Sequence, residues 1–186
     1  MEVITLTGKR ELDIYINPRR QNLLRLMRLI GAPVTPKALA DKMGISASSV
    51  QHHLGKLLEL GVVELDHTER IRGITASYYR VPPKVVQIGS LIEDGNAAQR
   101  LALMQNALTA AFSGFSEYCK RGAADLREGR QHGDMLSGII RLKDEEAKEL
   151  FGLIRAFLDA HEPGEEDGTP WEYALIAYPA REAGDA

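Results

Sequence analysis

Apolar residues recur at helical spacing in the first part of the chain, and glycine residues separate the segments. Residues 18–30 are predicted to form an amphipathic helix whose buried face consists of Leu23, Leu24, Met27 and Ile30. A second, short helix is predicted over residues 36–43, because Thr35 is a good N-cap and a proline follows it. Gly31 and Gly44 come directly after these segments, so both helices are expected to end there.

A third amphipathic helix is predicted from Ser46 to Leu60, after a short turn, and two helices joined in this way form a helix-turn-helix. Its apolar stripe consists of Val50, Leu54, Leu57 and Leu58. Rotation by about 100° per residue places the polar side chains on the opposite face: Ser48, Ser49, His52 and Lys56, with Gln51 and His53 on the flanks. This face has no acid near its start, which is typical of a helix that lies against phosphates and base edges. His53, beside the stripe, fits a structural role equally well.

The pattern changes to β-type after Gly61. Two runs rich in β-formers, residues 62–65 and 75–81, flank a polar turn over residues 67–73, which predicts a β-hairpin wing. The turn carries Arg70 and Arg72. Arginines on a thin projecting loop suit a narrow minor groove, although two solvated turn residues would give the same pattern.

The second half of the chain begins with an extended connector over residues 84–92 and a long helix over residues 97–122. The apolar positions of this helix step alternately by three and four residues: Leu101, Met104, Leu108, Ala111, Phe115 and Tyr118. Such a seam needs a partner, which is either a second subunit or the rest of the same chain.

The end of the chain is predicted to form a strand at residues 136–142, a helix at 144–161 and a strand at 171–178. Aromatic residues in this half could line an effector pocket, but aromatics at such spacing more often fill a plain core. The expected fold class is therefore α+β: an N-terminal winged helix-turn-helix, then a dimerisation helix and a small C-terminal strand-helix-strand subdomain.

Charge is distributed unevenly about Pro82-Pro83. Residues 1–83 carry 12 Lys and Arg against 8 Asp and Glu, whereas residues 84–186 carry 11 against 18. The basic half is the half that contains the helix-turn-helix pattern, which favours a nucleic-acid partner. We accordingly expect a DNA-binding domain over residues 1–83 and a dimerisation and effector-sensing domain over residues 84–186.

Other kinds of chemistry have little support in the sequence. It has no phosphate-binding glycine loop, nucleophile elbow or zinc-protease motif, so we expect neither an enzyme nor a cofactor. The single cysteine, Cys119, cannot form an intramolecular disulfide, and the metal-ligand candidates are sparse: Asp159, His161 and Glu162, or His132 with Asp134. No apolar run is long enough for a membrane span and the N-terminus does not resemble a secretion signal, so we expect a cytoplasmic protein with no membrane partner.

The segment from Asn17 to Tyr79 resembles the winged helix-turn-helix of the ArsR-like repressor superfamily. The resemblance rests on NPRRQNLLRLM, on TPKALADKMGISASSVQHHLGKLLELGVVELD and on the hairpin that ends in ASYYRV. It implies that residues 46–60 are the recognition helix and that Ser48, Ser49, Gln51 and His52 face bases or phosphates. It also implies a homodimeric repressor of transcription on double-stranded DNA. Gating of this repressor by a small-molecule effector is a separate hypothesis. A winged helix that binds protein instead of DNA is the alternative.

Overall fold

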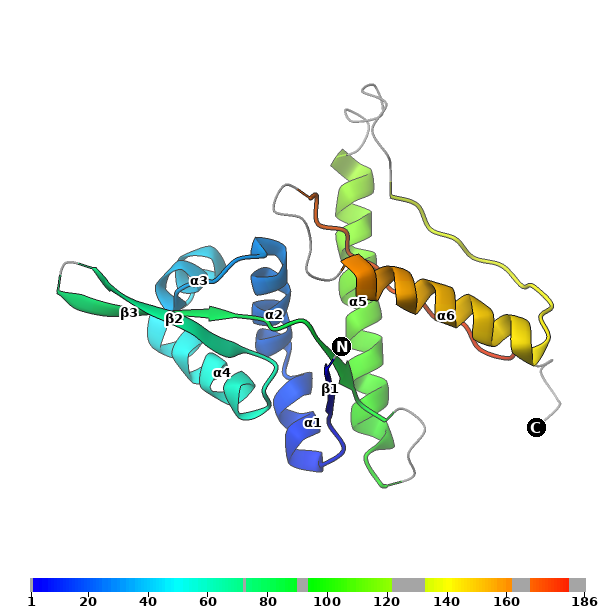
Figure 1. Cartoon of the computed structure of the whole chain (residues 1–186), viewed down its shortest axis with the longest axis horizontal. Helices are drawn as coiled ribbons and strands as arrows, with labels where there is room; N and C mark the ends of the chain where they lie inside the picture. The colour runs from blue at the N-terminus through cyan, green and yellow to red at the C-terminus, as the bar shows by residue number, and fades with distance from the viewer. Residues whose placement is uncertain (1, 72, 90–93, 122–132, 162–167, 181–186) are drawn as a thin grey trace. The chain divides into compact units, whose positions relative to one another are not determined.

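The computed structural model describes residues 2–71, 73–89, 94–121, 133–161 and 168–180 of the chain (Figure 1). The chain divides into two compact units. One comprises Met1–Leu103 and Ser137–Thr169, and the other comprises Met104–Leu136 and Pro170–Ala186. The first unit contains the helices and strands of the predicted winged domain.

Four short helices follow one another in the N-terminal part: α1 (Lys9–Ile16), α2 (Pro18–Ile30), α3 (Pro36–Met43) and α4 (Ala47–Glu59). Side chains cap the last three: Asn17 accepts the N–H groups of Arg19 and Arg20, Thr35 accepts that of Ala38, and Ser46 accepts that of Ser49. These caps satisfy N–H groups that have no partner within the helix. The helices predicted over residues 18–30, 36–43 and 46–60 are confirmed, with Ser46 as the cap of the third.

Helix α1 was not predicted from the sequence. A helix of this length is not stable alone in water, so its stability comes from tertiary contacts. Leu12, Ile14 and Tyr15 are buried, and side chains of α2 bind the last carbonyl groups of α1. Arg20 donates to the carbonyl oxygen of Ile14, and Gln21 donates to that of Tyr15.

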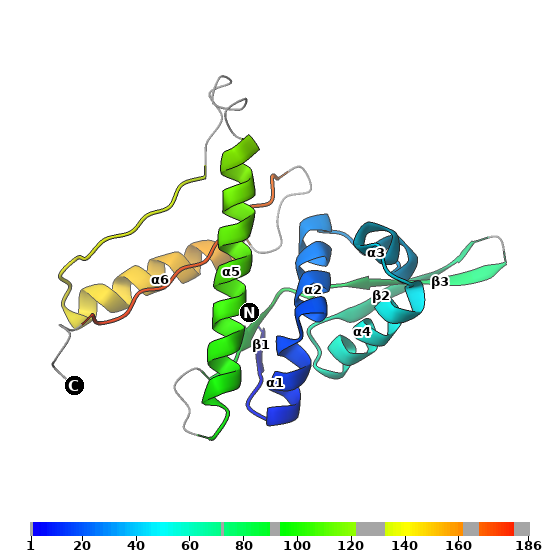
Figure 2. The ribbon, with the colours of Figure 1, turned by 180° about the vertical axis from the view of Figure 1, so that it is seen from behind.

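Strands β2 (Glu64–Ile71) and β3 (Ile74–Arg80) form an antiparallel hairpin that projects beyond α3 and α4 (Figure 2). The predicted hairpin is present, but β2 continues to Ile71, so the predicted turn over residues 67–73 is too long. Gly73 has a φ of 86°, a conformation that glycine adopts without strain and that permits a tighter turn. Val34 extends the sheet, because it exchanges two backbone hydrogen bonds of 2.9 Å with Tyr79.

A second, parallel pair of strands joins β1 (Glu2–Thr5) to β4 (Lys84–Gln87). Strand β4 lies in the segment that we expected to be extended. Strand β1 was not predicted, because a four-residue strand that pairs with a segment some 80 residues away leaves no local signal. The backbone N–H of Leu6 continues the pairing to the carbonyl of Gln87 at 2.8 Å.

The core of this unit consists of the apolar stripes of the short helices together with residues that flank the strands. Its most buried members include Leu12, Leu23, Leu24, Leu39, Val50, Leu54, Leu57 and Val63. Leu58, which we predicted to be in the stripe of α4, is 38% exposed. It follows Leu57 by one residue, and the 100° rotation carries its side chain away from the core.

The described part of the second half of the chain contains two long helices: α5 (Ala97–Arg121) and α6 (Asp144–His161). Both were predicted. Residues 136–142 and 171–178, however, form no strand in the structure, in contrast to the expected strand-helix-strand arrangement. A strand needs a neighbour that pairs with its backbone groups, and a sequence pattern does not say whether the chain supplies one. No helix in the described residues is long and apolar enough to cross a membrane.

Candidate nucleic-acid interface

The predicted recognition face lies on the solvent side of α4. Ser46, Ser48, Gln51 and His52 are exposed there, and Ser49 and Lys56 are half-buried. The hydroxyl oxygens of Ser46 and Ser48 lie 3.1 Å apart at the start of the helix. The first turn has no acidic residue. The face therefore offers hydroxyl, amide and imidazole groups and one ammonium group, the types of side chain that bind phosphates and base edges.

His53 belongs to the interior rather than to this face. Its side chain is 8% exposed, and its Nδ1 atom has no hydrogen-bond partner among the described residues. Burial, followed by the charges of Arg20, His52 and Arg19, lowers the pKa of His53 below its usual value. The structure thus favours the structural interpretation, with a neutral imidazole packed beside the apolar stripe.

The hairpin places its cations differently from the prediction. Arg70 is exposed, but it lies within β2 opposite Thr75, and not in the turn. Arg72 lies outside the described residues. At the base of the hairpin, Arg80 binds the carboxylates of Glu64 at 2.6 Å and Asp66 at 3.1 Å. Among the described residues of the hairpin, Arg70, toward the tip, therefore offers positive charge to a phosphate.

A hollow of about 420 Å³ lies between the start of α3, the start of α4 and the strand β3. Gln51 lines it from α4, and Thr75 and Ser77 line it from the hairpin. Neither hairpin residue was predicted to belong to the interface, because their orientation toward α4 depends on the strand register. The hollow brings polar side chains of the helix and the hairpin together on one surface.

The predicted dimerisation seam follows α5. Leu101, Met104 and Leu108 are 64%, 36% and 37% exposed, whereas Ala111, Phe115 and Tyr118 are half-buried. The rings of Phe115 and Tyr118 stack with centroids 6.3 Å apart. Phe112 is 65% exposed and was not among the predicted seam residues. The helix thus carries large apolar side chains on its surface.

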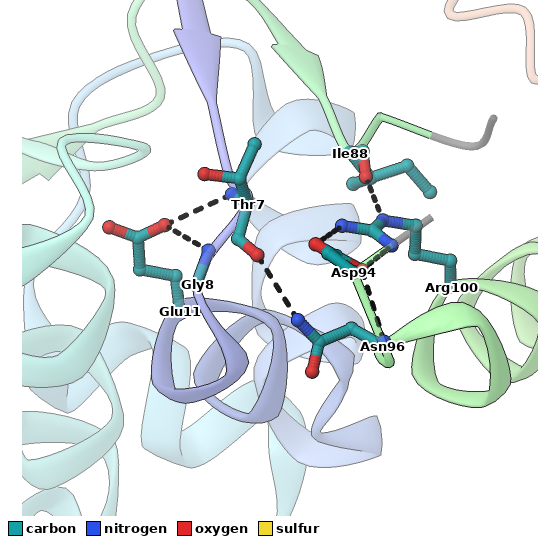
Figure 3. A network of polar contacts seen from close by, with 7 residues as sticks. All are labelled: Thr7, Gly8, Glu11, Ile88, Asp94, Asn96 and Arg100. Atoms are coloured by element: carbon teal, nitrogen blue, oxygen red, sulfur yellow. Dashed lines mark hydrogen bonds and ion pairs between the residues drawn. The ribbon is translucent and has the colours of Figure 1, made fainter. Parts of the chain in front are cut away.

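A polar network at the start of α5 was not anticipated (Figure 3). Arg100 is only 1% exposed, and its guanidinium forms two bonds to the carboxylate of Asp94 and a third to the carbonyl of Ile88. The bonds to Arg100 hold the pKa of Asp94 well below its usual range.

The same network reaches the turn between β1 and α1 (Figure 3). The side-chain amide of Asn96 donates to the carbonyl of Thr7 at 3.4 Å, and Glu11 accepts the backbone N–H groups of Thr7 and Gly8, each at 3.1 Å. The network therefore joins the first turn of α5 to the winged domain. The residues of this network are not spaced along the chain by a helical or strand repeat, so the sequence pattern does not predict the network.

Metal-binding groups do not cluster in the part of the chain that the structure describes, where no three His, Cys, Asp or Glu residues are placed to hold an ion. Two of the sparse candidates, His132 and Glu162, lie outside the described residues. Cys119 is exposed.

Comparison with known families agrees with this geometry. Residues 15–66, which run from the end of α1 through α4 into β2, match the family described as a helix-turn-helix domain. The search of curated proteins gave no match. A domain of this kind indicates a DNA-binding regulator of transcription. Residues 15–66 of this chain therefore match a helix-turn-helix domain, in agreement with the resemblance described for the sequence.

Proposed function

We propose that the chain is a sequence-specific regulator of transcription that binds double-stranded DNA as a homodimer, and that it acts as a repressor on an inverted-repeat operator. The observation that carries the proposal is the exposed polar face of α4, free of acids in its first turn, in a domain of the helix-turn-helix type. Helix α4 of each subunit enters a major groove, and the two grooves are centred roughly 34 to 36 Å apart.

The residues of this interface divide by the kind of contact. Ser48, Ser49, Gln51 and His52 contact base edges, and each good base contact contributes about 1 to 3 kcal/mol of discrimination. Lys56, Arg70 and Arg72 contact phosphates, so their contribution falls as salt rises. Ser46 caps α4 and presents the N-terminal end of the helix to the groove.

Residues 84–186 pair the two subunits and hold the site for a small-molecule effector. The exposed apolar side chains of α5 support pairing, since a surface of this kind is normally covered in an assembly. A second copy would also supply neighbours for residues 136–142 and 171–178, whose exposed Ile139, Trp171 and Tyr173 keep an apolar pattern typical of strands.

Selection of bound sequences from a random duplex pool tests the proposal. Wild-type protein should enrich an inverted repeat. Gln51→Ala and His52→Ala should each relax the preference at a definable base, whereas Arg70→Ala should weaken binding without changing the selected sequence. Lys148→Ala, on the exposed surface of α6, is the matched control. A pool that shows no enrichment would contradict the proposal and favour a winged helix that binds protein.

A further inference from the structure

A second hollow, of about 530 Å³, opens between α1, α2 and α4, on a different side of α4 from the hairpin. Lys9 and Arg10 line it from α1, Arg20 from α2, and Lys56 from α4, together with the carboxylate of Asp13. Lys9 and Arg10 are exposed. Glu59 lies beside this lining as a second carboxylate, so four cations face two carboxylates and the excess positive charge attracts an anion.

One of these cations, Arg20, already forms hydrogen bonds within the fold. Arg20 donates to the carbonyl oxygens of Ile14 and Asp13 at the end of α1, and its burial lowers its pKa. It shapes the inner wall of the hollow. The side chains of Lys9, Arg10 and Lys56 are therefore the ones that can reach an incoming anion.

A carboxylate holds two of these three cations in the free protein. Glu59 binds Arg10 at 3.0 Å and Lys56 at 2.6 Å, and all three side chains remain partly exposed. The hydrogen bond from Lys56 is the main cause of the lowered pKa of Glu59. Exposed ion pairs of this kind contribute little to stability, so an anion can take the place of Glu59 at low cost. Glu59 keeps Arg10 and Lys56 close together until an anion binds.

Lys56 also belongs to the outward face of α4. It follows His52 by one helical turn, as His52 follows Ser48, so the three side chains lie in a row. The row is about 12 Å long at the rise of an α-helix. The hollow therefore begins where the predicted base-reading face ends, which is where the sugar-phosphate backbone of a bound duplex would leave the groove.

We propose that this hollow binds a backbone phosphate of the DNA, next to the bases that α4 contacts, with Lys9 and Arg10 of α1 as phosphate-binding residues in addition to Lys56. The inference rests on the proposed function and extends its interface to α1. The phosphate competes with Glu59 for Arg10 and Lys56. Binding at this point positions α4 in the groove without reading sequence.

The test compares wild type with Lys9→Gln/Arg10→Gln, and uses Lys148→Gln/Arg155→Gln on the exposed surface of α6 as a control with the same loss of charge. Dissociation constants are measured over a salt series on the selected duplex and on an unrelated duplex. The α1 variant should weaken binding to both by a similar factor, keep the selected sequence, and lower the slope of log K against log salt by about 1 for the lost phosphate. Glu59→Gln should bind more tightly than wild type.

Neutral methylphosphonate linkages, placed one at a time in the selected duplex, locate the contact. One position should weaken wild type but leave the α1 variant unaffected. Equal sensitivity of both proteins at every position, or an α1 variant with the affinity and salt slope of wild type, would overturn the inference while leaving the proposed function intact. Wild-type protein that binds no duplex would overturn both.

Discussion

Helices α4 and α6 carry the same kind of apolar stripe, but only one of the two stripes is buried. In α4, Val50, Leu54 and Leu57 are at most 2% exposed. The stripe of α6 consists of Leu150, Phe151, Ile154, Phe157 and Leu158. Phe151 and Phe157 are 42% and 65% exposed, the other three are half-buried, and Leu153 beside them is 64% exposed, and no residue of that helix is buried. An apolar stripe thus shows that a helix needs a partner, but not where the partner is. For α4 the partners are the short helices beside it in the chain.

The stability of the folded chain should accordingly depend far more on α4 than on α6. Leu57→Ala removes a fully buried side chain and leaves a cavity, so we expect the free energy of unfolding to fall by about 2 to 5 kcal/mol. Leu153→Ala, the same change at an exposed position, should alter it by about 0.5 kcal/mol or less at a concentration where the protein is monomeric. Urea unfolding measures both values, and equal losses for the two variants would contradict the comparison.

The same contrast explains which parts of the fold the sequence predicts. Helices α2, α3 and α4 were predicted because Thr35, Ser46, Gly31 and Gly44 mark their ends and their stripes meet locally. Strand β1 and the Arg100–Asp94 pair were not, because their partners are distant or irregularly spaced along the chain. The recognition face of α4 follows from helical rotation alone. The hollow beside α1 does not, since it requires knowing how three helices pack.

The oligomeric state extends the comparison of buried and exposed apolar side chains to α5. A second copy is the partner that we propose for the exposed side chains of that helix. Leu108→Ala should raise the dimer dissociation constant about tenfold, a change equivalent to about 1.4 kcal/mol. Asn106→Ala, a polar exposed position on the other side of the same helix, is the control and should leave the constant unchanged. Sedimentation equilibrium gives both values. Wild-type protein that stays monomeric at high concentration would exclude the dimer.

The smallest expected effect concerns pH, and it separates the interior of α4 from its surface. The pKa of His53 is lowered in the folded protein, so the unfolded chain binds more protons at pH values below about 6.5. Stability should therefore fall as pH decreases through that range, by less than the loss caused by Leu57→Ala. His53→Gln should remove this part of the pH dependence. His52→Gln, one residue away but exposed, should retain it. Free energies of unfolding measured at pH 7.5 and 5.5 compare the two variants with wild type. If the His52 variant lost the pH dependence and the His53 variant kept it, the assignment of His53 to the core of α4 would be wrong.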